Sequence, residues 1–353
     1  MKPDNIYLTD NNLFYVFLSK NDNKIYSILI NNFYEMRSCY NEVYNIYDGS
    51  KILKKLITTF KLSNLEYEYH SMEYYMNNNN KNEYLIGLYL DRNSYGKNYI
   101  IIFDITNNYI IKNKIQVDYR ISYPANLLLI FPPNISNNYI IIPSTKNEYI
   151  YERNESTFIT KAYLFETGEF IRDFTNTLNK SISHLIHWHN DKNNNDYVIQ
   201  LGAMIINNLS DDRYYEMKVG GYFGFIYKEN DVDYLYCNDW KGINIINLDT
   251  RKLVKRVEIN SNEQFRYLIQ WNERYLISVL NWFIIWDLEE KTTIYISPPA
   301  KKNSINLSIL FIEKIRHPKY GESLIVLCGE GEQKKVGYST SYFIKIWSIP
   351  SFD

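Results

Sequence analysis

Helix-favouring residues are scarce in this chain of 353 residues. Alanine, which has the highest helix propensity, occurs only at Ala125, Ala162, Ala203 and Ala300. A mainly helical domain is therefore disfavoured.

Cysteine is also scarce, and the spacing of the cysteines matches no metal-binding motif. The three cysteines, Cys39, Cys237 and Cys328, lie far apart and form no Cys-x-x-Cys pair. This excludes a disulfide framework and a cysteine zinc motif, and it is typical of reduced thiols in an intracellular protein.

Long apolar runs and an excess of charge of either sign are missing as well. The amino terminus is too polar for a signal peptide, and no run is long enough to span a membrane. The formal charge of −1 argues against broad capture of nucleic acid or anionic membrane. We expect a cytoplasmic or nuclear protein without membrane insertion.

What the chain does have is an abundance of strand formers. Tyrosine alone contributes 35 residues, the aromatic share is 16%, and apolar residues make up 45%. These values favour an all-β chain with a large core. Asparagine runs such as Asn77–Asn80 separate strand-like segments, where turn-forming residues are expected, and they fit the codon bias of an AT-rich genome.

One pattern recurs along the chain: an apolar strand, a polar turn and a second strand. The stretch Trp282–Ser297 shows it most clearly, with Trp286-Asp287 at the start of the turn. Equivalent turn positions are Asp48, Asp104, Glu166, Asn207, Asn247, Asp287 and Ser348. Three consecutive spacings of 41, 40 and 40 residues are the length that a four-stranded propeller blade needs.

The repeat predicts one domain over residues 1–353. We expect a seven-bladed β-propeller of four-stranded antiparallel blades, because each interval holds two further strand-like runs. The last copy ends at a strand over 342–349 and lacks a fourth strand. A closing strand near residues 5–10 would complete that blade and leave no open edge at the join.

Some copies resemble the WD-repeat propeller family. Trp286 and Asp287 match its signature pair, Trp347 matches the Trp, and Thr167-Gly168 match the turn that follows. No Gly-His dipeptide occurs, so the family's hydrogen-bonded tetrad cannot be complete in any blade. The best remnant is Ser278 with Trp286. The resemblance implies a divergent propeller acting as an assembly platform in multiprotein complexes.

The stretch HLIHWHND, residues 184–191, is a weak candidate metal site. Side chains alternate along a strand, so His187, His189 and Asp191 share one face and His184 points to the other. The alternative interpretation is a set of polar residues beside a wet channel or turn.

The leading hypothesis is a monomeric, non-catalytic scaffold that binds other proteins and needs no cofactor. Aromatic and arginine side chains in enlarged loops are the expected anchors: Tyr95, Tyr149, Tyr151 and Arg153. Two alternatives stay open. A propeller enzyme would gather its site from several loops, although no serine elbow, Cys–His pair or dinucleotide motif is present. An RNA-binding propeller would use basic residues on predicted outer strands: Lys51, Lys54, Lys55, Lys252, Lys255 and Arg256.

Overall fold

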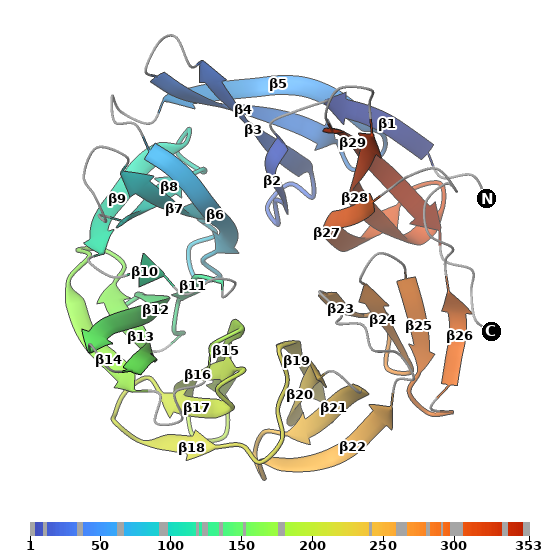
Figure 1. Cartoon of the computed structure of the whole chain (residues 1–353). Coiled ribbons are helices and arrows are strands. Elements are labelled where there is room, and N and C mark those ends of the chain that lie inside the picture. Colours follow the sequence, from blue (N-terminus) through green and yellow to red (C-terminus); the bar gives the residue numbers. More distant parts are fainter. Residues whose placement is uncertain are drawn as a thin grey trace. The chain divides into compact units, whose positions relative to one another are not determined.

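The structure is a computed structural model of the whole chain (Figure 1). It describes residues 4–9, 13–33, 38–61, 67–91, 98–117, 120–121, 126–133, 137–150, 153–175, 181–239, 242–258, 267–279, 283–290, 292–296, 306–333 and 338–348. In these ranges the regular elements are β-strands, and no helix is long and apolar enough to cross a membrane. The chain divides into two compact units, residues 67–268 and residues 1–66 with 269–353.

The central unit contains four antiparallel sheets, each built from consecutive strands. The first is β6 (Tyr67–Met76), β7 (Glu83–Asp91), β8 (Asn98–Asp104) and β9 (Ile110–Val117). The second is β10 (Arg120–Ile121), β11 (Leu128–Ile130), β12 (Tyr139–Ile150), β13 (Arg153–Leu164) and β14 (Phe170–Thr175). The third is β15 (His184–Asn190), β16 (Asn195–Leu201), β17 (Ile205–Asn208) and β18 (Tyr214–Glu216). The fourth is β19 (Phe223–Glu229), β20 (Val232–Asp239), β21 (Gly242–Asn247) and β22 (Lys252–Glu258).

The unit that contains both chain ends holds three sheets. One is β2 (Leu13–Leu18), β3 (Ile25–Phe33), β4 (Ser38–Tyr47) and β5 (Ile52–Lys61). Another is β23 (Tyr267–Gln270), at the boundary between the units, with β24 (Tyr275–Val279), β25 (Phe283–Asp287) and β26 (Thr292–Ile296). The third is β27 (Asn306–His317), β28 (Gly321–Gln333) and β29 (Tyr338–Ser348), completed by β1 (Asp4–Thr9).

The prediction of seven four-stranded blades is wrong. Six sheets have four strands, whereas the sheet of β12 has five, because β10 and β11 both pair with it. On β12, Ser144 faces β10 and Ile141 faces β11, and Pro143 lies between them. Proline has no N–H to donate, so a continuous ladder is interrupted there and the expected single strand becomes two short ones.

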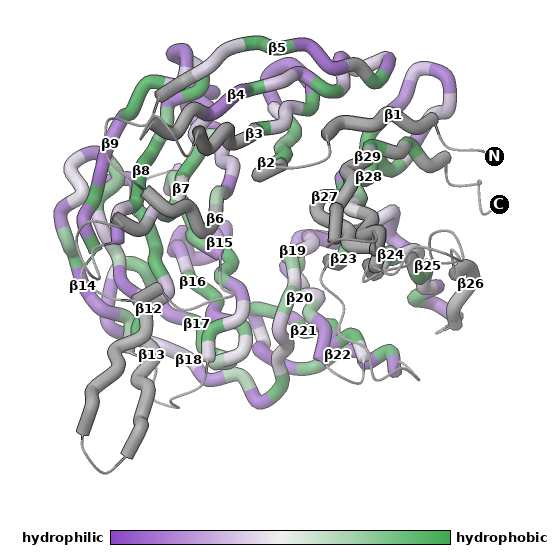
Figure 2. The backbone as a smooth tube through the Cα atoms, turned by 45° about the horizontal axis from the view of Figure 1, so that its top comes forward, coloured by the Kyte–Doolittle hydropathy of each residue, from purple (hydrophilic) through white to green (hydrophobic). Residues whose placement is uncertain are grey.

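The all-β class is confirmed, and apolar clusters pack consecutive sheets of the central unit together. Each cluster draws side chains from two neighbouring sheets, as Ile86 on β7 and Ile140 on β12 illustrate. A second cluster joins the sheets of β12 and β16, and a third joins those of β16 and β20. Figure 2 shows the resulting contrast between the largely hydrophobic β8 and the more polar β9. Burial of apolar area, about 25 cal/mol per Å², is therefore the main stabilising term.

The predicted turn positions lie at or just after the third strands of their sheets. In six sheets the turn begins with a side-chain oxygen that accepts a backbone N–H two or three residues later. The acceptors are Asp48, Asp104, Thr167, Asn208, Asn247 and Asp287. Two differ from the predicted positions by one residue, Thr167 for Glu166 and Asn208 for Asn207. The turn residue Gly168 has φ +73°, a conformation that favours glycine.

The fourth strands share a feature that the sequence did not reveal. In five sheets the register between the third and fourth strands shifts by one residue, which leaves one residue of the outer strand without a counterpart; the β4–β5 ladder has a second irregularity between Asn45 and Tyr47. The residues without a counterpart are Ile57, Lys112, Ile171, Val254 and Ile294. Such β-bulges bend an edge strand and change the direction of its side chains, which discourages uncontrolled pairing of edges.

The two ends of the chain meet in one sheet. β1 pairs antiparallel with β29, with Asp4 opposite Ile346 and Tyr7 opposite Phe343. The neighbouring sheet of β2–β5 packs on this sheet, since Ile46 and Ile344 belong to one buried cluster. The strand pairing expected between the amino and carboxyl ends is therefore present.

Candidate functional site

The predicted interaction residues lie at or beyond the limits of the described structure. Tyr95 and Tyr151 fall outside the described residues. Tyr149 and Arg153 have backbone positions near the end of the β12–β13 hairpin, where Tyr149 pairs with Asn154 and Ile150 with Arg153. A paired hairpin therefore replaces much of the enlarged loop that was expected there.

The histidine-rich stretch forms β15, and its side chains alternate as predicted. His187 and His189 turn to one face and meet the same acceptor, Asp196 on β16. His187 Nε2 lies 2.7 Å and His189 Nδ1 3.0 Å from Asp196 Oδ1. Because an ionised carboxylate only accepts, both imidazoles donate to that oxygen.

Asp196 is the buried centre of this cluster, with a side chain that is only 2% exposed. Burial alone would raise its pKa, but the hydrogen bonds and charges of His187 and His189 outweigh that effect and hold the pKa below its usual value. The neighbouring Asp191 pairs instead with Lys228 of β19, 2.5 Å away, which lowers the pKa of Asp191. The carboxylates of Asp196 and Asp191 are thus held in their ionised form.

The cluster does not have the geometry of a metal site. In the described part of the chain no group of three or more His, Cys, Asp or Glu residues is arranged to hold a metal ion. The imidazole nitrogens that face Asp196 are already hydrogen-bonded to it, and His189 Nε2 lies 3.6 Å from Asp191 Oδ1.

His184, on the opposite face of β15, has a different environment. Its ring stacks on Phe223 of β19 with centroids 4.4 Å apart. Burial lowers its pKa to about 4, so the ring is neutral near pH 7. His184 is a packing residue between two sheets of the central unit.

Polar contacts join the sheets of β15–β18 and β19–β22 around this cluster. Trp188 Nε1 donates to Asp233 Oδ2 on β20 at 2.9 Å. Lys192, in the β15–β16 turn, pairs with Asp249 in the β21–β22 turn. Together with the Asp191–Lys228 pair, these contacts hold the turns of two neighbouring sheets in fixed positions.

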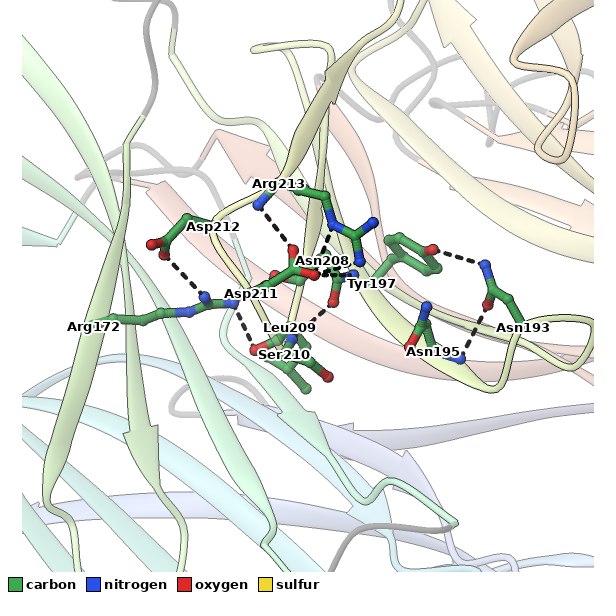
Figure 3. A network of polar contacts seen from close by, with 10 residues as sticks. All are labelled: Arg172, Asn193, Asn195, Tyr197, Asn208, Leu209, Ser210, Asp211, Asp212 and Arg213. Carbon is green, nitrogen blue, oxygen red and sulfur yellow. Dashed lines mark hydrogen bonds and ion pairs between the residues drawn. The ribbon is translucent and has the colours of Figure 1, made fainter.

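A second network joins the sheet of β14 to the β17–β18 turn (Figure 3). Arg172 on β14 donates through Nη2 to the carbonyl oxygens of Asn208 and Leu209 at 2.5 and 2.6 Å, and through Nη1 to Asp212 at 3.3 Å. The turn itself is closed by Arg213, whose Nε donates to Asp211 at 2.7 Å. A guanidinium that satisfies two carbonyls resists displacement because its removal would leave those acceptors unpaired.

Comparison with known proteins agrees with this arrangement at the level of the fold. No family model and no curated protein matches the chain. A solved structure described as the Dos1 propeller matches with a TM-score of 0.56 and 9% identity, covering 98% of this chain and 95% of that one. The fold is a β-propeller. The AfRom2 CNH domain is also similar, with a TM-score of 0.55 and 9% identity over 99% of this chain and 100% of that one.

The propeller presents exposed apolar residues mainly on its outer strands. Exposed pairs are Leu56-Ile57 on β5, Ile110-Ile111 on β9, Phe170-Ile171 on β14 and Leu253-Val254 on β22. Each pair lies at or beside a bulge. Sequence alternation alone would place one member of each pair inside, so the bulge is the signal that sequence reasoning lacked.

Two basic residues of the outer strands make structural contacts. Arg256 on β22 is held by Asp239, with Nη1–Oδ2 and Nη2–Oδ1 distances of 2.7 and 3.1 Å. Lys54 on β5 lies over the ring of Tyr44 at 5.3 Å from its centroid. These contacts use part of the positive charge that could otherwise bind phosphate groups.

Proposed function

We propose that this propeller is a non-catalytic scaffold, a WD40-like subunit or adaptor that docks other proteins on preformed surfaces. The observation that carries the proposal is the set of exposed apolar pairs on outer strands whose sheets are held together by buried clusters and polar contacts. Binding to a preformed surface costs little ordering entropy.

The WD40-like assignment is supported by one buried hydrogen bond. Trp286 Nε1 donates to Ser278 Oγ at 2.7 Å, the pair identified in the sequence as a remnant of the family's tetrad. Asp287 then begins the turn by accepting the amides of Glu289 and Glu290. These contacts support a divergent WD repeat in this sheet.

Two observations favour a scaffold over the alternatives. Asp191 is bound to Lys228, which removes one carboxylate from the candidate general acids and bases of this cluster. Arg256 is engaged by Asp239, which reduces the basic patch proposed for RNA.

The test is purification of the tagged full chain from its native cell, followed by size-exclusion chromatography and mass spectrometry. We expect partner proteins at fixed stoichiometry in a complex much larger than 42.3 kDa. Gly224→Val is the control. A Cβ at Gly224 would lie 2.4 Å from the carbonyl oxygen of Tyr236, so this variant should disrupt the fold. Partners that bind the folded propeller should then be lost. Elution as a free monomer, or assembly that ribonuclease abolishes, would contradict the proposal.

A further inference from the structure

One exposed area of the central unit combines apolar and basic side chains. We define the β22 patch as Arg251, Lys252, Leu253 and Val254. Leu253 is 41% and Val254 59% exposed. Figure 1 shows β18 and β22 on the outer side of neighbouring sheets, and Arg251 joins them by lying 3.4 Å from the ring centroid of Tyr215.

The bulge in β22 explains why two consecutive apolar residues are exposed. Ile246 pairs with Leu253 and Ile245 with Lys255, which leaves Val254 without a counterpart on β21. The extra residue breaks the alternation of faces, so Leu253 and Val254 both remain accessible. β22 is also the edge of its sheet, so no strand of the described structure covers this side of it.

The charges of the β22 patch are of one sign. It contains two cations and no carboxylate, and within the described residues Lys252 makes no ion pair. Glu258, the acid of β22, lies at the far end of that strand. Asp249, just before the patch, is engaged by Lys192.

The exposed pair on β9 provides a contrast. Ile110 is 61% and Ile111 41% exposed, so the apolar area resembles that of β22. The adjacent Lys112, however, is paired with Glu166 at 3.0 Å. Uncompensated positive charge beside exposed apolar side chains therefore distinguishes the β22 patch from the β9 pair.

We propose that the β22 patch is the docking site for an acidic protein segment that carries apolar side chains. This proposal rests on the scaffold function and assigns a surface and a partner chemistry to it. Leu253 and Val254 supply apolar contact area, and Lys252 with Arg251 attracts carboxylates of the segment. Arginine side chains are enriched among residues that dominate binding energy.

The binding test uses a displayed library of random short peptides, panned on the full chain. Selected peptides should be enriched in Asp and Glu together with apolar residues, and their affinity should fall with added salt. The double variant Lys252→Glu/Val254→Asp should weaken them by at least about tenfold. Ile110→Asp/Ile111→Asp, the matched control on β9, should leave their affinity unchanged. Both variants change exposed residues, and equal melting temperatures would verify their folds.

Any other result overturns the proposal. This includes no enrichment, selection of basic or neutral peptides, or equal loss of binding in both double variants. Poly(U) RNA and phosphatidylserine vesicles are assayed in parallel. Tighter binding of either by the wild-type chain, lost in the β22 variant, would assign the patch to RNA or membrane instead.

The same variants separate this proposal from the scaffold function. If the native complex forms with Lys252→Glu/Val254→Asp at wild-type yield, the β22 patch is not the docking site but the scaffold function stands. If the wild-type chain forms no complex at all, the scaffold function itself fails.

Discussion

Asp287, at the end of the third strand of its sheet, binds Arg274 through one carboxylate oxygen and the following turn through the other. Arg274 donates to Asp287 Oδ2 through Nε at 2.6 Å and Nη2 at 2.5 Å. The other carboxylate oxygen, Oδ1, accepts the backbone amides of Glu289 and Glu290 at 2.9 and 3.0 Å. One aspartate thus fixes both the turn and the start of the preceding hairpin, which explains why a Trp-Asp pair marks this repeat in the sequence.

Asp287→Ala should destabilise the protein more than Asp287→Asn does. Both lose the charge that attracts Arg274, but Asn retains an oxygen that accepts the turn amides. We expect the difference in free energy of unfolding to be about 1–2 kcal/mol. Urea unfolding of the two variants measures it, and equal stabilities would show that the amide contacts contribute nothing.

Acid should weaken this turn. The hydrogen bond from Arg274 lowers the pKa of Asp287 below its usual value. A depressed carboxylate pKa stabilises the folded state above the unfolded value of 3.8, and that stabilisation is lost as the pH falls through the folded pKa. Asp287→Asn should therefore lose less stability than the wild type on acidification below pH 3.8.

Ser278→Ala should destabilise the sheet of β23–β26 although it removes a single oxygen. The variant leaves Trp286 Nε1 buried without its acceptor. An unsatisfied buried donor costs about 1–3 kcal/mol. Ser210→Ala, at an exposed turn position, is the control and should change the free energy of unfolding by less than about 0.5 kcal/mol. Similar values for the two variants would argue against a role for the hydrogen bond.

The burial of His184 predicts a second pH effect, in which the folded state loses stability at acidic pH. The pKa of His184 falls from 6.5 to about 4, so the folded state disfavours its protonation. Stability is fully present above pH 6.5 and declines as the pH drops towards 4. His184→Phe retains a ring to stack on Phe223 and should reduce this decline. Melting temperatures across that range test it, and parallel profiles would refute it.

Glu73 on β6 should have the opposite effect. Burial raises its pKa from 4.5 to about 8, so the folded state favours the neutral carboxyl. Stability is greatest below pH 4.5 and declines as the pH rises towards 8. Glu73→Gln should therefore be more stable than the wild type above pH 8 and equally stable below pH 4.5. Glu290→Gln, on an exposed turn, is the control for the loss of one charge, and a matching gain there would contradict the prediction.

The sequence was sufficient for the strand repeat because its markers act locally. Side chains such as Asp48 and Asp287 accept hydrogen bonds from backbone N–H groups two or three residues later. The spacing of these residues therefore indicates where the third strands end. The sheet of β12 was mispredicted because Pro143 affects a neighbouring strand through a missing donor, an effect that has no periodic signature.

The candidate site could be predicted only in part. Alternation along β15 correctly placed His187 and His189 on one face. Their acceptor Asp196 comes from the next strand, and nothing in the sequence distinguishes it from the solvated acids of nearby turns. The exposed Leu253-Val254 pair depends on a bulge, which is set by pairing with β21 rather than by local sequence.

The pairing of β1 with β29 has a consequence for how the chain reaches its native state. Residues 4–9 pair with residues 338–348, so this ladder closes only when two segments far apart in the sequence meet. Contacts of such long sequence separation form slowly. Until they form, β29 has an open edge that the β1 segment of another copy could occupy. Exchange of that segment between copies would then produce domain-swapped dimers, and a separate peptide of residues 4–9 would compete with it.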